Sequence, residues 1–143
     1  HLKEAYQLLM EDTNPSWLYQ VKKGATTMWE QWDVIEENGQ VKEASMNHYA
    51  YGAVGDFFYR RICGLEPVEA GYRRFRVKPM PGGGLTNAQC SYICIYGTIR
   101  VAWRIEEGKM KLKISVPVGT TCEVELPNGK KEELVSGNYE LHE

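Results

Sequence analysis

The chain has 143 residues, of which 43% are hydrophobic and 25% are charged, and these values are typical of about one folded domain and exclude a disordered or fibrous protein. No apolar run approaches the roughly 18–20 residues of a membrane-spanning helix, so no membrane partner is predicted. The 17 basic and 19 acidic side chains leave a net charge of −2, which argues against a nucleic-acid partner because such affinity depends on neutralising phosphates.

The N-terminal residues have a helical pattern. An apolar stripe near helical spacing predicts a first helix that ends by Asp12, and the stripe consists of Leu2, Tyr6, Leu9 and Met10. A second, short helix is expected over Ser16–Lys23, with Pro15 in its first turn and Gly24 at its end. After it, the Asn38-Gly39 turn signal predicts a short hairpin or protruding loop over residues 33–45.

A longer helix is predicted over Asn47–Cys63. Asn47 or Ser45 is expected to cap it, and Gly64 stands where a glycine commonly follows a helix. The expected apolar face consists of Ala50, Val54, Phe57 or Phe58, and Ile62. About 64 residues with three or four helices are too few for an independent helical core, so this half is expected to belong to something larger.

From Tyr72 onward, short β-rich runs are divided by turn residues, which favours an antiparallel β-sandwich. Strands are expected near residues 73–77, 85–88, 90–96, 98–106, 109–116, 121–125, 133–135 and 139–141. Arg74, Arg76 and Lys78 should share one solvated face of the first of these strands. The four cysteines form no C-x-x-C pair and are expected to be buried, unbridged side chains.

The segment from Gly24 to Asp33 carries the most suggestive chemistry, because Glu30 stands between Trp29 and Trp32. An indole can stack on the apolar face of a sugar, and a neighbouring carboxylate can bind hydroxyls or act as a base or nucleophile. The alternative is a buried aromatic pair beside a surface glutamate. Asp33 would share a face with Glu30 if the segment were helical, or would instead bind a nearby loop.

His48 is a second candidate, either as a ligand-binding side chain or as a structural hydrogen-bonding group. No histidine cluster has the spacing of a metal site. Gly82-Gly83-Gly84 lacks the Lys-Ser/Thr of a phosphate-binding loop. The sequence therefore predicts neither a metal nor a cofactor.

Four segments resemble the bacterial α-L-rhamnosidases of glycoside hydrolase family 78, in order, between about Trp17 and Leu141. The segment 24–33 is similar to the family's G-A-T-T-x-W-E-x-W stretch, and residues 45–55 to its S-x-N-H-x-x-x-G-x-V helix. Residues 71–79 resemble the entry into the family's C-terminal sandwich, and residues 96–103 its Y-G-x-I-x-x-x-W strand pair. Ala70 departs from the family's usual proline, and Phe57-Phe58 from a common tryptophan.

The resemblance implies an α+β fragment, in which residues 1–66 are the last helices of an (α/α)6 catalytic toroid and residues 67–143 an antiparallel β-sandwich. The implied parent is bacterial, cytoplasmic, periplasmic or secreted, and removes terminal α-L-rhamnose from glycosides or polysaccharides with inversion. The remainder of the parent chain, with the missing toroid helices, would be the partner of this one.

The resemblance also assigns roles to individual residues. Glu30 matches the general base that activates water, and His48 a histidine that contacts rhamnose; Trp29 and Trp32 would wall the pocket or hold Glu30. Inverting glycosidases need two carboxyl groups about 6.5–9.5 Å apart, and the general acid belongs to a motif absent from this chain, so the chain alone is expected to be inactive. The alternatives are another toroidal glycosidase, or a non-catalytic carbohydrate-binding or scaffolding sandwich.

Overall fold

The computed structural model describes residues 1–143 and divides them into two compact units, His1–Gly55 and Asp56–Glu143. None of the helices is long and apolar enough to cross a membrane. The break between the units falls at Gly55, and the boundary between toroid and sandwich expected at residues 66–67 stays a prediction.

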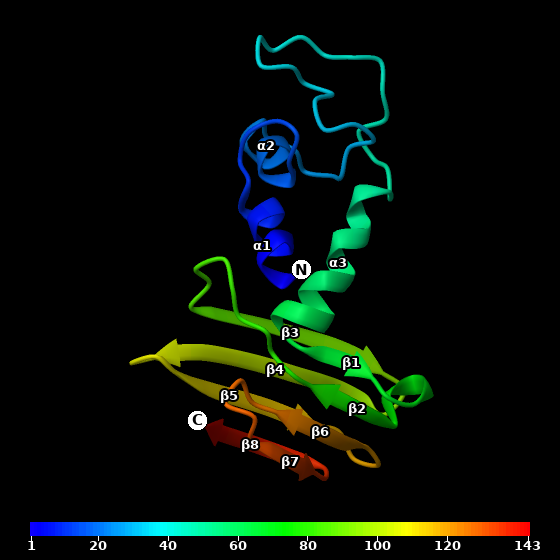
Figure 1. The fold of residues 1–143 in the computed structure, drawn as a ribbon. Coiled ribbons are helices and arrows are strands. Elements are labelled where there is room, and N and C mark those ends of the chain that lie inside the picture. Colours follow the sequence, from blue (N-terminus) through cyan, green and yellow to red (C-terminus); the bar gives the residue numbers. More distant parts are fainter. The chain divides into compact units, whose positions relative to one another are not determined.

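The first unit begins with the two expected helices, α1 (Leu2–Met10) and α2 (Trp17–Lys22) (Figure 1). The Ser16 hydroxyl caps α2 by accepting a hydrogen bond from the Tyr19 amide at 3.0 Å. Because Ser16 supplies the cap, Pro15 precedes the helix, and its expected place in the first turn was wrong. Gly24 follows the helix with a φ of 84°, as predicted.

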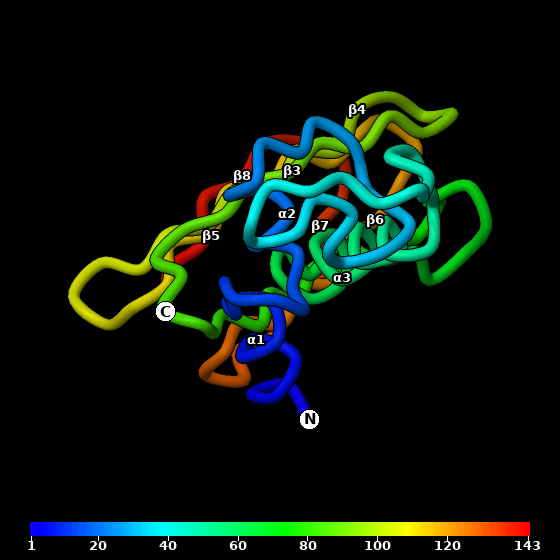
Figure 2. Tube along the Cα trace, turned by 90° about the horizontal axis from the view of Figure 1, so that it is seen from above, coloured from blue at the N-terminus to red at the C-terminus, as the bar shows by residue number.

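Residues 24–50 form a long irregular loop that doubles back on itself (Figure 2). A single β-bridge joins Ile35 and Val41 around the predicted Asn38-Gly39 turn, in which the Gly39 amide donates to the Glu36 carbonyl at 3.0 Å. The hairpin prediction is therefore confirmed in its shortest form.

The long helix begins at Tyr51, four residues later than predicted. It consists of a 3-10 turn (η1, Tyr51–Ala53), α3 (Val54–Phe57) and a π-helical turn (η2, Phe58–Ile62). The expected caps do not act as caps, because the Ser45 hydroxyl and the Asn47 backbone bond to each other within the preceding loop. Of the expected apolar face, only Ile62 is fully buried.

Gly64 ends this helix and has a φ of 78°, as predicted. A Cβ at this position would lie 2.1 Å from the Lys78 carbonyl carbon, so only glycine allows the two backbones to approach this closely. The Lys78 amide donates to the Gly64 carbonyl at 2.9 Å, which fixes the start of the sandwich to its second strand.

The second unit contains two four-stranded sheets and confirms the predicted β-sandwich (Figure 1). One sheet has the order β1-β2-β6-β7, made of Leu65–Pro67, Arg74–Val77, Thr121–Glu125 and Lys131–Leu134. The other has the order β3-β4-β5-β8, made of Asn87–Cys94, Gly97–Glu106, Lys109–Val116 and Gly137–His142.

The sheets differ from the sequence prediction in three ways. β2 and β6 pair in parallel, because the chain passes through β3, β4 and β5 before it returns to the first sheet. The strands expected at residues 85–88 and 90–96 are one strand, β3, since no turn residue divides them. β1 was missed because it has three residues and includes a proline, which an edge strand tolerates.

The core of this unit follows the predicted alternation of buried and exposed side chains. Its fully buried members include Phe75, Val77, Ile99, Leu112 and Cys122, each 0% exposed. Burial of such side chains contributes roughly 1.5–3 kcal/mol apiece. The Trp103 indole nitrogen donates to the Ile62 carbonyl at 2.7 Å, so this buried polar group is satisfied. All four cysteines are free, but only Cys63 and Cys122 are buried as predicted, whereas Cys90 and Cys94 are half-buried.

Candidate active site

The loop that bears Glu30 is bonded to the loop that bears His48. The Glu30 amide donates to the Ser45 carbonyl at 2.9 Å, and the His48 amide donates to the Met28 carbonyl at 2.8 Å. The Thr27 hydroxyl donates to the Met46 carbonyl between these two bonds. The structure therefore brings the two principal candidate residues onto adjacent segments, although they are 18 positions apart in the sequence.

The Glu30 carboxylate is exposed and has one backbone donor, because the Ser45 amide donates to Oε2 at 2.9 Å. Glu30 and Ser45 thus hold each other through two hydrogen bonds, one from each backbone amide. This arrangement fixes one carboxylate oxygen, and the other remains available to accept a proton from water.

Asp33 does not form a pair with Glu30, because residues 30–33 are not helical. Its carboxylate binds Lys42 of the adjoining loop at 2.6 Å. This hydrogen-bonded ammonium group holds the pKa of the Asp33 carboxyl below its ordinary value of 3.8. Asp33 therefore stays ionised at neutral pH and has a structural role in the loop, the alternative that the sequence left open.

Gln20 of α2 fixes the backbone on both sides of Glu30. Its side-chain oxygen accepts a hydrogen bond from the Trp29 amide at 3.4 Å, and its side-chain nitrogen donates to the Gln31 carbonyl at 3.1 Å. Gln20 is 2% exposed, and a buried amide with both ends bonded restricts the loop strongly. The backbone of the loop is therefore set by a helix that precedes it in the sequence.

The two tryptophans beside Glu30 lie in different environments. Trp29 is 2% exposed, so burial favours a role in holding the loop. The Trp32 indole stacks on Tyr51 with ring centroids 3.7 Å apart, and it forms a T-shaped pair with Trp17 with ring centroids 5.1 Å apart. The Trp17 indole nitrogen donates to the Tyr51 carbonyl at 3.0 Å, which closes an aromatic cluster of three rings.

The His48 ring is oriented by its own loop. Its Nδ1 accepts a hydrogen bond from the Ala50 amide at 3.2 Å, and the ring lies parallel to Tyr49 with centroids 5.2 Å apart. A neutral imidazole that accepts at Nδ1 carries its proton at Nε2. His48 can therefore present an N–H donor to a hydroxyl group of a ligand.

Gln20 and Ser45 were missed by sequence reasoning. A signal for Gln20 existed, since Ser16, Tyr19 and Gln20 have the i, i+3, i+4 spacing of one buried helix face. Nothing in the sequence around Ser45 indicates that its backbone bonds Glu30, because that contact joins segments 15 residues apart.

The arrangement suits proton transfer to one carboxylate beside a hydrogen-bond donor that can orient a polar ligand. No group of three or more histidine, cysteine, aspartate or glutamate side chains in residues 1–143 lies close enough to hold a metal ion.

Comparison with protein-family models divides the chain into two matches. Residues 1–62 match the bacterial α-L-rhamnosidase six-hairpin glycosidase domain, and residues 64–140 match the bacterial α-L-rhamnosidase C-terminal domain.

Individual relatives agree with this assignment. An α-L-rhamnosidase of Streptomyces avermitilis is 43% identical over 130 residues, which are 89% of this chain and 13% of that protein. The crystal structure of the S. avermitilis α-L-rhamnosidase complexed with L-rhamnose matches 100% of this chain and 16% of its own, with a TM-score of 0.94 and 36% identity. That of the native enzyme from Aspergillus terreus matches 96% of this chain and 17% of its own, with a TM-score of 0.92 and 38% identity.

The chain thus spans less than one fifth of the length of these relatives. The matches cover both compact units, at identities that establish common descent. The chain therefore belongs to the bacterial α-L-rhamnosidase family.

Proposed function

We propose that the chain is the C-terminal part of a larger inverting α-L-rhamnosidase, with residues 1–66 completing its catalytic toroid and residues 67–143 forming its terminal sandwich. The family membership and the share of the relatives that the chain covers support this division. The substrate would be a rhamnose-containing glycoside, and the remainder of the catalytic domain would pack on the helical unit.

In this proposal Glu30 is the general base. Its carboxylate accepts a proton from water as the water oxygen bonds to the anomeric carbon of rhamnose. The glycosidic bond breaks at the same time, and the leaving oxygen takes a proton from a general acid elsewhere in the parent protein. The observation that carries this role is the geometry of Glu30, an exposed carboxylate with one oxygen held by the Ser45 amide.

The neighbouring residues have supporting roles. His48 donates from Nε2 to a sugar hydroxyl, and Trp32, with its ring fixed by Tyr51 and Trp17, would line the sugar site that the remainder of the parent completes. Trp29 is buried and holds the loop in place. The isolated chain is inactive in this account, since one carboxylate alone provides only half of the acid–base pair.

The test compares two charge-neutralising variants of the full-length parent enzyme on an aryl α-L-rhamnoside. Glu30→Gln should lower kcat by about 100-fold or more. Glu43→Gln is the matched control, since Glu43 is an exposed acid of the same loop that makes no ion pair. It should leave kcat within about twofold of the wild-type value.

Equal activity of the Glu30→Gln variant and the wild type would remove Glu30 as the base. If the wild-type enzyme did not hydrolyse rhamnosides but hydrolysed another glycoside, rhamnose would be the wrong sugar.

A further inference from the structure

The outer face of the sheet β3-β4-β5-β8 has an excess of basic side chains. Five basic residues point outward from β4 and β5, and two acidic residues lie on the same face: Arg100, Arg104, Lys109, Lys111 and Lys113, against Glu106 and Glu140. This difference leaves a local charge of about +3 on a chain whose net charge is −2. Arg100 and Lys109 make no ion pair.

The outer face of the other sheet is electrically balanced. Arg76 binds Glu123 at 3.0 Å and Glu66 at 3.4 Å, and Arg74 binds Glu123 at 2.7 Å. Lys78 binds Glu125 at 2.8 Å. The excess of positive charge is therefore a property of one face, whereas the solvated basic face predicted on β2 is neutralised by its neighbours.

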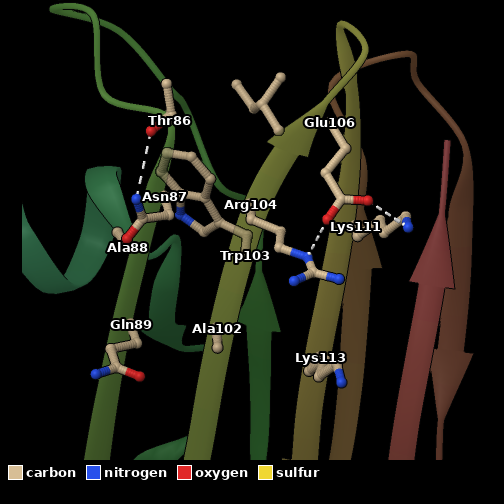
Figure 3. A pocket seen from close by; sticks show the side chains of 11 residues that line it. Thr86, Asn87, Ala88, Gln89, Ala102, Trp103, Arg104, Glu106, Lys111 and Lys113 are labelled. Atoms are coloured by element: carbon tan, nitrogen blue, oxygen red, sulfur yellow. Dashed lines mark hydrogen bonds and ion pairs between the residues drawn. The ribbon is translucent and has the colours of Figure 1, made fainter.

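The cationic face is also hollowed. Ala102 of β4 lies opposite Gln89 of β3 and Lys113 of β5, and its short side chain leaves a space between the longer ones. Figure 3 shows Gln89, Ala102 and Lys113 on three neighbouring strands, with Arg104 farther along β4. This hollow has a volume of about 500 Å³.

A second hollow of about 450 Å³ lies beside the first and shares Ala102 and Lys113 with it. It adds Arg100, Ser115, Asn138 and Glu140 to the lining, and Lys113 binds the Glu140 carboxylate at 3.3 Å. Together the two hollows form a shallow groove over the sheet face. The groove contains both charged side chains and neutral amides, and amides can donate to and accept from hydroxyl groups.

We propose that this groove binds an acidic oligosaccharide, a chain of sugars that carries carboxylate or sulfate groups. Arg100, Arg104 and Lys113 would bind the anionic groups, and Gln89 and Asn138 the hydroxyls. Glu106 lies at one end of the groove, where Arg104 at 2.7 Å and Lys111 bind its carboxylate, so it does not occupy the centre. Of the two aromatic residues in the lining, Trp103 is 2% exposed and Tyr139 is half-buried, so charged and amide groups provide most of the polar contacts open to a ligand.

The inference rests on the proposed function, since it adds an acidic glycan as the substrate class of a rhamnosidase. Binding at this face would hold a polymeric substrate on the enzyme and raise its local concentration at the active site. A small aryl rhamnoside carries no anionic group for the groove to bind, so its hydrolysis should be independent of the groove.

The test measures binding by isothermal titration calorimetry to the full-length parent enzyme. The probes are a galacturonic acid pentamer, its fully methyl-esterified form, a sulfated galactose pentamer and a single-stranded DNA of equal charge. The carboxylated or the sulfated pentamer should bind, and the uncharged methyl ester should bind at least tenfold more weakly. The identity of the tighter ligand distinguishes carboxylate from sulfate.

Two double variants locate the site. Arg100→Gln with Lys113→Gln should weaken binding about tenfold and reduce its salt dependence, since exposed ionic contacts contribute modestly. Lys130→Gln with Lys131→Gln is the matched control, because it removes the same charge from the exposed edge of the other sheet. It should change the affinity less than twofold.

Filling the groove gives an independent readout. Ala102→Leu keeps every charge. It should weaken binding of the pentamer about tenfold and leave kcat on the aryl rhamnoside unchanged. Three results would overturn the proposal: no binding of either acidic pentamer, equal weakening by the two double variants, or DNA binding as tight as that of the sugars. If the wild-type parent enzyme bound the acidic pentamer but did not hydrolyse the aryl rhamnoside, the proposed function would be wrong and the groove proposal would stand.

Discussion

The two compact units hold their shapes by different kinds of interaction. In the first unit, Tyr6, Tyr19, Trp29 and Val34 are the buried hydrophobic residues, and Ser16 and Gln20 are buried beside them. Its long loop is fixed by hydrogen bonds from these polar groups and between loop backbones. The second unit is built on two sheets around a continuous apolar core.

Because of this difference, the apolar core that stabilises the fold and the side chains of the candidate site lie in different units. A core of interlocking apolar side chains resists change throughout its volume, whereas a loop held by a few buried polar contacts places a side chain accurately and depends on each of them. The candidate site lies in the first unit, on a loop held by polar contacts, and binding and catalytic residues commonly lie on loops.

Thiol labelling should show the largest effect of the apolar core. Burial raises the pKa of the Cys122 thiol to about 12, and the thiolate is the reactive form. At pH 8 we expect Cys122 in the folded protein to react with iodoacetamide about a thousandfold more slowly than a free cysteine. Mass spectrometry of the labelled peptide measures this rate, and rapid labelling without denaturant would contradict the buried core.

Removing a core ring should weaken that protection. Phe75 is 0% exposed and lies opposite Cys122 across β2 and β6, so Phe75→Ala should lower the free energy of unfolding of the sandwich by about 3–5 kcal/mol. Labelling of Cys122 in a urea series measures the change. Phe58→Ala, at a ring that is 41% exposed, should cost less than about 1 kcal/mol; equal effects would contradict the assigned packing.

Removing a polar clamp should affect the first unit in a different way. Gln20→Ala leaves the Trp29 amide without its side-chain partner, and a buried unsatisfied group costs about 1–3 kcal/mol. We expect kcat of the full-length enzyme to fall about tenfold, because the backbone around Glu30 is released. Gln31→Ala keeps the carbonyl that Gln20 binds and should leave kcat within about twofold. A normal kcat in Gln20→Ala would show that the clamp does not position Glu30.

The ion pair of the loop should give the smallest effect, and it should depend on pH. Lys42 lowers the pKa of the Asp33 carboxyl in the folded state, so the pair stabilises the fold above the ordinary value of 3.8 and loses this contribution as the pH falls through the lowered value. Both side chains are about one third exposed, which limits the contribution to about 1 kcal/mol at neutral pH. Asp33→Asn should therefore reduce stability at pH 7 by more than it does in acid, with the difference shrinking as the pH falls below 3.8, as measured by urea unfolding; a constant difference would exclude the ion pair as its cause.

The sequence predicted the second unit more completely than the first. Alternation identified most strands, because one buried and one exposed face leave a period of two in the residues themselves. It missed β1, which has three residues, and the parallel pairing of β2 with β6, which depends on the path of the chain through the other sheet.

In the first unit, local signals failed where distant contacts decide the structure. Asn47 and His48 have the sequence of a helix start, but the His48 amide bonds to Met28, and the helix begins at Tyr51. Glu30, between Trp29 and Trp32, and His48 were candidates from the residues alone, and the resemblance to a family assigned their roles. The clamp by Gln20 depends on the tertiary fold and appears only in the structure.

Azide rescue of the Glu30→Gln parent enzyme would show whether Glu30 acts as the base of an inverting reaction. Azide is a nucleophile that needs no base, so it should restore the release of aglycone from an aryl α-L-rhamnoside and form β-L-rhamnosyl azide, which nuclear magnetic resonance identifies. Glu43→Gln should form no azide product. Rescue that yields the α-azide would rule out inversion, and a Glu30→Gln enzyme that releases rhamnose at the wild-type rate without azide would rule out Glu30 as the base.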